Sequence, residues 1–139
     1  MGIFDRLFGK KNLRNDPRAL KNKEKKSLYS NSSAVAEAER NAMAKEDLKE
    51  AILSLVKIYN ECKGPQFVGL SNYYAGKFDA CGIVENHLKG ESLYTVEYLE
   101  NWKKYDATRV GDEFNRGRWE VLSWALSRLY EKEYLSKKE

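Results

Sequence analysis

The chain has 139 residues, of which 42% are hydrophobic and 33% are charged, with 25 Lys and Arg against 21 Asp and Glu. This length and composition predict one soluble globular domain, which can bury a sizeable core without a disulfide framework or a structural metal. Its apolar runs are far shorter than the roughly 18 residues of a membrane-spanning helix, so the sequence excludes that class of protein.

The net charge of +4 is unevenly distributed along the chain. Residues 1–33 contain nine Lys and Arg and three acids, whereas residues 34–139 contain sixteen and eighteen. The sequence therefore predicts a basic N-terminal arm over 1–33, followed by a helical domain over 34–139. A basic arm is typical of contact with the phosphates of nucleic acid or lipid headgroups, and a solubilising tail is the alternative. The candidate phosphate contacts are Arg6, Lys10, Lys11, Arg14 and Arg18.

The first eight residues form a short amphipathic pattern. Four large apolar side chains at spacing i, i+1, i+4 and i+5 share one helical face: Ile3, Phe4, Leu7 and Phe8. A helix this short is marginal alone in water, so we expect the segment to dock on its own domain, a partner or a membrane surface.

Residues 34–62 contain neither glycine nor proline, and they predict one continuous helix that is capped by Ser32 or Ser33. Its second half carries an apolar stripe at helical spacing: Leu48, Ile52, Leu55, Tyr59 and Cys62. Three further helices are predicted over 71–89, 93–105 and 112–135. Their expected N-caps are Ser71, Ser92 and Asp112, and Gly90 is expected to end the first of them.

Two stretches of the sequence, residues 71–88 and 112–129, repeat the same pattern at an interval of 41 residues. Aromatic, glycine, cation and acid recur in register, as Tyr73 with Phe114, Gly76 with Gly117, Lys77 with Arg118, Phe78 with Trp119, and Asp79 with Glu120. Because short connections make antiparallel neighbours, the repeat predicts an all-α four-helix bundle made of two similar helical hairpins.

The glycines of the repeat are unexpected inside helices, where glycine costs about 1 kcal/mol relative to alanine. A missing Cβ permits close approach, so Gly76, Gly117, Phe78 and Trp119 are predicted to mark a crossing of the second and fourth helices, or an interface between two copies. Tolerated surface glycines are the alternative interpretation. The neighbouring charges can pair across the crossing, Lys77 with Glu120 and Arg118 with Asp79.

The sequence contains no recognisable catalytic, cofactor-binding or metal-binding constellation, and no small-molecule substrate is implied. His87 is the only histidine, and a histidine near a helix end is expected to contact terminal carbonyls. Cys62, Cys81 and His87 are too scattered for a zinc site, so the cysteines are expected to be buried thiols in a reducing compartment. Residues 69–77 lack the glycine spacing of a phosphate loop.

The aromatic residues suggest a binding function. Tyr94, Tyr98, Trp102 and Tyr105 follow one another at steps of four, four and three on the predicted third helix. Aromatic and arginine side chains dominate the energetics of protein interfaces, so this stripe is a candidate protein-binding surface. Stacking of single-stranded nucleic acid ranks lower, because few cations are interleaved with the rings.

Two short motifs carry a family resemblance. The opening Met-Gly-Ile-Phe-Asp-Arg-Leu-Phe-Gly-Lys-Lys resembles the N-terminus of bacteriophage portal proteins and of small phage or bacterial peripheral proteins. The repeated pattern of aromatic, two residues, glycine, cation, aromatic and acid is similar to helices of short phage proteins. The resemblance implies a phage or mobile-element origin, although the chain is far shorter than a portal. In that setting, a small helical protein is expected to be a virion accessory or a binder of a host factor.

The sequence therefore favours a non-enzymatic protein-interaction module, self-associating or bound to a host or virion protein, and located in the cytoplasm or the virion. A peripheral protein anchored by residues 1–14 at the inner face of the membrane is the first alternative. A nucleic-acid binder that uses the basic arm is the second.

Overall fold

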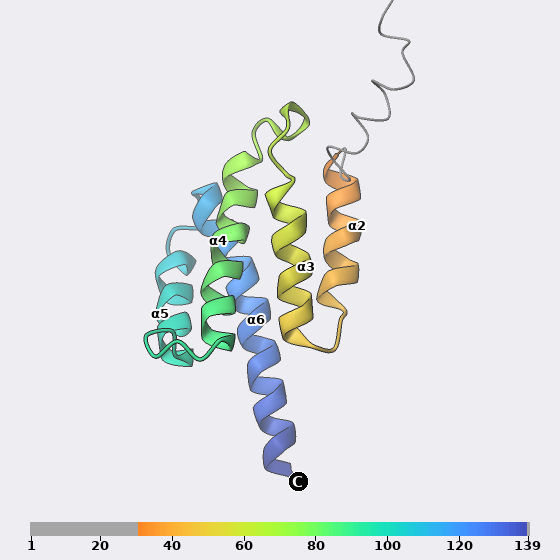
Figure 1. The fold of residues 1–139 in the computed structure, drawn as a ribbon. Helices are drawn as coiled ribbons and strands as arrows, with labels where there is room; N and C mark the ends of the chain where they lie inside the picture. The colour runs from red at the N-terminus through yellow and green to blue at the C-terminus, as the bar shows by residue number, and fades with distance from the viewer. Residues whose placement is uncertain (1–30, 139) are drawn as a thin grey trace, which may run out of the picture. The chain divides into compact units, whose positions relative to one another are not determined.

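A computed structural model of the chain describes residues 31–138, with side chains described as far as Glu133. The described residues are helical and contain no strand, which confirms the all-α fold class (Figure 1). The helices are α2 (Ser32–Met43), α3 (Leu48–Asn60), the 3₁₀ helix η2 (Pro65–Phe67), α4 (Ser71–Leu88), α5 (Val96–Ala107) and α6 (Glu113–Lys138). The predictions for the basic arm lie outside the described residues, namely the anchor Ile3, Phe4, Leu7 and Phe8 and the phosphate contacts Arg6, Lys10, Lys11, Arg14 and Arg18.

The prediction of one continuous helix over 34–62 is wrong, so the described residues form five α-helices rather than four. The chain turns after Met43, and Asp47 opens α3 by accepting a hydrogen bond from the backbone N–H of Lys49 at 3.0 Å. An Asp followed three residues later by a Glu is a helix-start signal, and Asp47 and Glu50 carry it. The break needs no glycine or proline, because the Asp47 side chain accepts a hydrogen bond from a backbone N–H group that would otherwise lack a partner at the start of α3.

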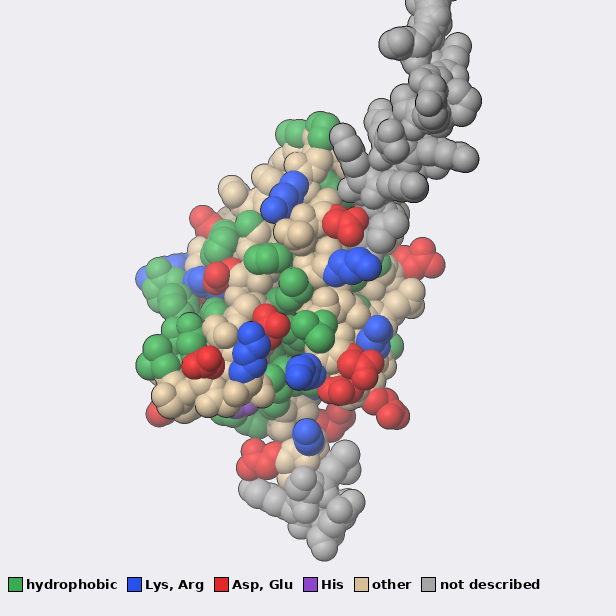
Figure 2. Space-filling view, viewed as in Figure 1, with side chains coloured by type: hydrophobic (Ala, Val, Ile, Leu, Met, Phe, Trp, Pro, Cys, Tyr) green, Lys and Arg blue, Asp and Glu red, His purple; other side chains and the backbone are tan. Residues whose placement is uncertain are grey.

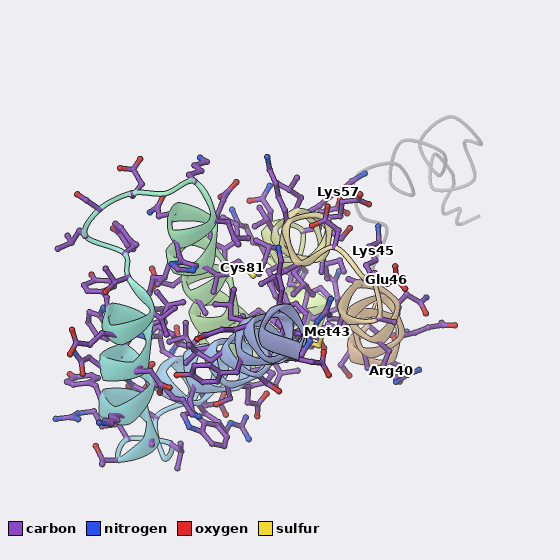
Figure 3. All side chains as sticks on the ribbon, turned by 90° about the horizontal axis from the view of Figure 1, so that it is seen from below. Arg40, Met43, Lys45, Glu46, Lys57 and Cys81 are labelled. Carbon is purple, nitrogen blue, oxygen red and sulfur yellow. The ribbon has the colours of Figure 1, made fainter. Side chains whose placement is uncertain are left out.

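Arg128 of α6 stabilises the turn between α2 and α3. Its guanidinium donates to the carbonyl oxygens of Met43 at 3.0 Å, Lys45 at 2.7 Å and Glu46 at 2.6 Å. Figure 3 labels Met43, the last residue of α2, together with Lys45 and Glu46 of the turn that leads to α3. A side chain more than 80 residues away in the sequence therefore holds the turn.

The helix starts also differ from the predicted caps, except at α6. Asn31 caps α2 through the N–H of Ala34 at 2.9 Å, and Thr95 caps α5 through the N–H of Tyr98 at 3.1 Å. Ser32, Ser33 and Ser92 are therefore not the caps, and Ser71 is the first residue of α4 rather than its cap. Asp112 accepts from the N–H of Asn115 at 3.2 Å, as predicted. Gly90 follows α4 with a φ of +82°, a conformation that favours glycine and ends a helix.

Helices α4 and α6 form the central pair of the fold. Helix α3 packs on α4, α5 packs on α6, and α2 packs on the outer side of α3 (Figure 1). The fully buried side chains come from every one of these helices: Val35, Ile52, Leu55, Val84, Leu99, Leu122 and Leu126, joined by Phe67 of η2. No helix within residues 31–138 is both long and apolar enough to cross a membrane.

Candidate interaction site

The closest approach of α4 and α6 is reciprocal. A Cβ atom on Gly76 would lie 2.0 Å from the carbonyl oxygen of Phe114, and one on Gly117 would lie 2.2 Å from the carbonyl oxygen of Tyr73. Both distances are impossible for real atoms, and the obstructing atoms are backbone. Glycine is therefore required at both positions for the two helices to touch.

The two aromatic residues predicted at the same crossing, Phe78 and Trp119, lie in different surroundings. Phe78 is 41% exposed and lines a surface cleft between α3 and α4, so it does not share the crossing. Two residues after Gly76, the helix has turned by about 200°, which carries Phe78 away from the contact with α6. Trp119 is half-buried on α6.

Lys77, directly after Gly76, is the centre of a buried polar network. Its side chain is only 7% exposed, and Nζ lies 2.7 Å from Glu39 Oε2 and 3.6 Å from Glu120 Oε1. The hydroxyl of Tyr59 donates to Glu39, and that of Tyr73 donates to Glu120. The ammonium also lies 4.4 Å from the centroid of the Tyr73 ring, within the range of a cation–π contact.

Arg118, directly after Gly117, is the centre of a second network. Its Nε and Nη2 atoms donate to the two oxygens of Asp106 at 2.8 and 2.9 Å, a bidentate pair whose carboxylate is fully buried. Asn115 Nδ2 donates to the same carboxylate at 2.9 Å. Arg118 Nη1 reaches Asp79 at 3.1 Å, and the guanidinium lies 4.3 Å from the centroid of the Trp102 ring.

The predicted pairs across the crossing, Lys77 with Glu120 and Arg118 with Asp79, are both confirmed. Two acids that the repeat does not predict, Glu39 and Asp106, make the shorter contacts with these cations. Helical spacing offered a signal, since Glu39 lies four residues after the buried Val35 and Asp106 lies seven residues after the buried Leu99. Each cation thus pairs with one acid of the central helices α4 and α6 and with one acid of another helix, which is α2 for Lys77 and α5 for Arg118.

The surroundings of Lys77 shift the pKa values of several groups. Burial, and then the nearby Glu39 carboxylate, raise the pKa of the Tyr59 hydroxyl well above its ordinary value of 10.0. Burial followed by Glu39 also raises the pKa of the Cys62 thiol to about 12. For Lys77, burial favours the neutral form, but the charge of Glu39 together with the hydrogen bonds of Glu39 and Tyr73 outweighs it, and the pKa is raised above 10.5.

These shifts predict that the protein loses stability at alkaline pH. Above pH 10, unfolded chains lose the Tyr59 proton while the folded protein keeps it, so unfolding becomes more favourable as pH rises. The stability that Lys77 contributes is likewise complete below pH 10.5 and is lost as pH rises through its folded pKa. We expect urea midpoints, measured from pH 8 to 11, to fall steeply above about pH 10.

Tyr59→Phe should flatten that fall by about 1.4 kcal/mol per pH unit above pH 10, because one titrating group is removed. Equal slopes in the wild type and Tyr59→Phe would contradict the assignment of the alkaline transition to Tyr59.

The remaining sequence candidates occupy structural positions. His87 Nδ1 lies 2.7 Å from the carbonyl oxygen of Tyr94, a contact that ties the end of α4 to the segment before α5. Cys62 and Cys81 are free and buried, as expected. Among the described residues, no group of three or more His, Cys, Asp or Glu side chains could hold a metal ion.

The predicted aromatic stripe forms a continuous series of ring contacts along α5, although the helix begins at Val96 and Tyr94 lies just before it rather than on it. Ring centroids are 5.0 Å apart for Tyr94 and Tyr98, 6.5 Å for Tyr98 and Trp102, and 5.4 Å for Trp102 and Tyr105, each pair being edge-to-face. The Arg109 guanidinium lies 3.7 Å from the Tyr105 centroid. We call Tyr94, Tyr98, Trp102 and Tyr105 the aromatic ladder. Its first three side chains are half-buried and Tyr105 is exposed, so the ladder presents large rings at the surface.

The described residues thus combine a rigid polar centre with a partly exposed row of aromatic rings. Comparison with known proteins adds no family or functional assignment. No family model, no curated protein and no solved structure matches this chain.

Proposed function

We propose that this protein is a non-enzymatic protein-interaction module, and that the aromatic ladder of α5 is its binding surface. The observation that carries the proposal is the row of four rings in mutual contact, partly exposed and followed by a stacked arginine. Tyr, Trp and Arg are the side chains that contribute most to binding at protein interfaces. Tyr and Trp offer large contact areas for little loss of conformational entropy.

The setting of the ladder supports a binding role because its rings are already held in place. Trp102 rests against Arg118, and Arg118 is fixed by the buried Asp106 at the end of the same helix. Each of the other three rings contacts a neighbouring ring of the ladder. A surface that is ordered before the partner arrives loses less entropy on binding.

We also infer that α3–α4 and α5–α6 are two similar helical hairpins that form the four-helix part of the fold, with α2 added outside it. The reciprocal contacts of Gly76 and Gly117, and the reciprocal pairs of Lys77 and Arg118, support this interpretation. Within a phage or mobile-element setting, the partner would be a virion protein, a host factor or a second copy of the chain.

Site-specific photo-crosslinking in the producing cell tests the proposal. A benzophenone amino acid in place of Asn101, an exposed residue of α5, should give a discrete protein adduct. The same group in place of Arg40, an exposed residue of α2, is the matched control and should give none. The α5 adduct should disappear when Tyr98 and Tyr105 are both changed to alanine. An α5 adduct that survives this change would contradict the role of the ladder.

A further inference from the structure

Helices α2 and α3 are joined by a short connection, residues 44–47, which we call the hinge. All of its side chains are exposed, and Figure 2 shows charged side chains of both signs gathered at the lower end of α2 and α3, where the hinge lies. Beside it, a cleft of about 750 Å³ extends to Leu88 of α4 and Leu129 of α6. Because the hinge buries no side chain of its own, a change in its conformation would disturb little packing.

The backbone of the hinge can be satisfied in two conformations. In the turn, three carbonyl oxygens accept hydrogen bonds from the Arg128 guanidinium, those of Met43, Lys45 and Glu46. In a straight helix, the same oxygens would accept from backbone N–H groups four residues further along the chain. The backbone at Asp47 is extended, with a ψ of 116°, and a rotation there would make it helical. Straightening therefore exchanges one set of hydrogen bonds for another and leaves these carbonyl oxygens paired.

The sequence of the hinge also favours a helix. Residues 34–62 contain neither glycine nor proline, and Ala44, Lys45 and Glu46 are strong helix formers. In a straight helix over residues 32–60, α2 would extend about 18 Å beyond the start of α3, at 1.5 Å per residue. It would then no longer lie beside α3 of its own copy.

Helix α2 docks through a face that a straight helix would preserve. Val35 and Ala42 are buried on this face, and Glu39 between them pairs with Lys77 and accepts from the Tyr59 hydroxyl. The spacing i, i+4, i+7 places the three residues on one side of any α-helix. Because the short hinge makes α2 and α3 antiparallel, two straight helices laid side by side in opposite directions would bring each α2 onto the α3 of the other copy.

The end of α6 points to the side on which such a second copy would lie. Helix α6 continues past Arg128 as far as Lys138, and Figure 1 shows its last turns beyond the hinge, past the ends of the other described helices. A straight helix would direct α2 to the same side, because α2 would continue the line of α3 backwards through the hinge. A second copy would therefore lie beside the part of α6 that extends beyond its own bundle.

We propose that two copies of this chain form a two-fold dimer by exchanging α2. Residues 32–60 of each copy form one straight helix, and Glu39 of one copy pairs with Lys77 of the other. The partner follows from complementarity, since the surface that α2 leaves is the one that the second copy's α2 fits. The monomer and the dimer differ mainly at the hinge. The aromatic ladder is unchanged in this dimer, and Arg40 stays exposed because α2 docks in the same way.

A pair of charge reversals tests the exchange in the full-length protein. Glu39→Lys and Lys77→Glu each place two like charges together, both in the monomer and in a dimer of identical copies. An exchanged dimer that contains one copy of each variant has opposite charges at both contacts. When the two variants are unfolded together in urea and refolded, sedimentation velocity should show a dimer. Its urea midpoint should exceed that of either variant alone.

A mixture of Lys77→Glu with Glu120→Lys is the matched control. These two residues also form an ion pair, but both lie outside α2, so the pair stays within one copy. This mixture should show no gain in stability. An ordinary dimer without exchange would show no gain in either mixture, because each residue 39 would then face residue 77 of its own chain.

Two hinge variants test the conformational change separately. Lys45→Ala, Glu46→Ala and Lys45→Gly, Glu46→Gly remove the same exposed side chains and keep the carbonyl oxygens that bind Arg128. They differ in helix propensity, and both hinges of the dimer must be helical. The alanine variant should therefore dimerise at least about a hundredfold more tightly than the glycine variant. Sedimentation equilibrium of the refolded proteins over a range of concentrations measures both dimerisation constants.

Three outcomes would overturn the proposal. One is that the mixture of Glu39→Lys and Lys77→Glu unfolds as its two components do separately. Another is that the alanine and glycine hinge variants dimerise equally. The third is that the alanine hinge variant remains a monomer at its highest soluble concentration. If the charge-reversal variants do not fold alone, their mixture still decides, because only exchange of α2 can restore both pairs.

Discussion

Replacing Gly117 with alanine is expected to destabilise the protein by about 3 kcal/mol or more. The added Cβ would lie 2.2 Å from the carbonyl oxygen of Tyr73, and backbone atoms cannot rotate aside as a flexible side chain can. The two central helices would have to move apart, and the buried contacts along α4 and α6 would loosen with them. Urea unfolding followed by circular dichroism measures the loss. Gly76→Ala should behave in the same way, since its Cβ would lie 2.0 Å from the carbonyl oxygen of Phe114.

Gly82 offers a matched control in α4, the helix that also carries Gly76. It lies inside α4, but a Cβ built there would meet no heavy atom within 4 Å. Gly82→Ala should therefore stabilise the protein by about 0.5–1 kcal/mol, through the higher helix propensity of alanine. Opposite signs for Gly117→Ala and Gly82→Ala would separate close packing from helix propensity. If Gly117→Ala is as stable as the wild type, α4 and α6 do not cross at this point.

Replacing Asp106 with asparagine is expected to cost about 3–5 kcal/mol. The carboxylate is fully buried and accepts two hydrogen bonds from Arg118 and one from Asn115. Removal of its charge leaves the guanidinium of Arg118 buried without its main counter-ion. The measurement is the free energy of unfolding in urea. Because asparagine has nearly the same size as aspartate, a lower value reports the loss of the charge.

Asp79 provides the comparison for Asp106, because it pairs with the same guanidinium from the surface. Its side chain is 47% exposed, so water can replace it, and Asp79→Asn should cost less than about 1 kcal/mol. The double variant Asp106→Leu, Arg118→Leu removes both buried charges and should recover much of the stability lost in Asp106→Asn. Equal effects of Asp106→Asn and Asp79→Asn would show that burial does not set the strength of this network.

The two networks suggest why the repeated pattern places a cation directly after each glycine. The glycine brings the backbones of α4 and α6 together, which places the next side chain at the edge of the contact. Each cation then reaches the acid of the other repeat. Lys77 of α4 pairs with Glu120 of α6, and Arg118 of α6 pairs with Asp79 of α4. We expect such buried pairs to define the register of the two helices more than to add stability.

Local sequence patterns were sufficient to predict the all-α class, the position of α4, the cap at Asp112 and the pairs across the crossing. They failed at the turn after Met43, although Asp47 and Glu50 carried the signal, because an alanine-rich segment without glycine or proline also favours an unbroken helix. They failed for Phe78 because similarity between repeats does not determine which face of each helix is covered. In α4 that face borders a surface cleft.

The sequence by itself determined which segments are helical and which residues recur in both halves, because propensity, capping and periodicity act over a few neighbouring residues. Only the tertiary structure decided what surrounds each side chain. Glu39 and Asp106 became partners of Lys77 and Arg118 because outer helices fold back over the crossing, bringing together residues that are 38 and 12 positions apart. The exposure of the aromatic ladder and of Phe78 was decided in the same way, since it depends on which helices pack against α5 and α4 and which faces they leave to solvent.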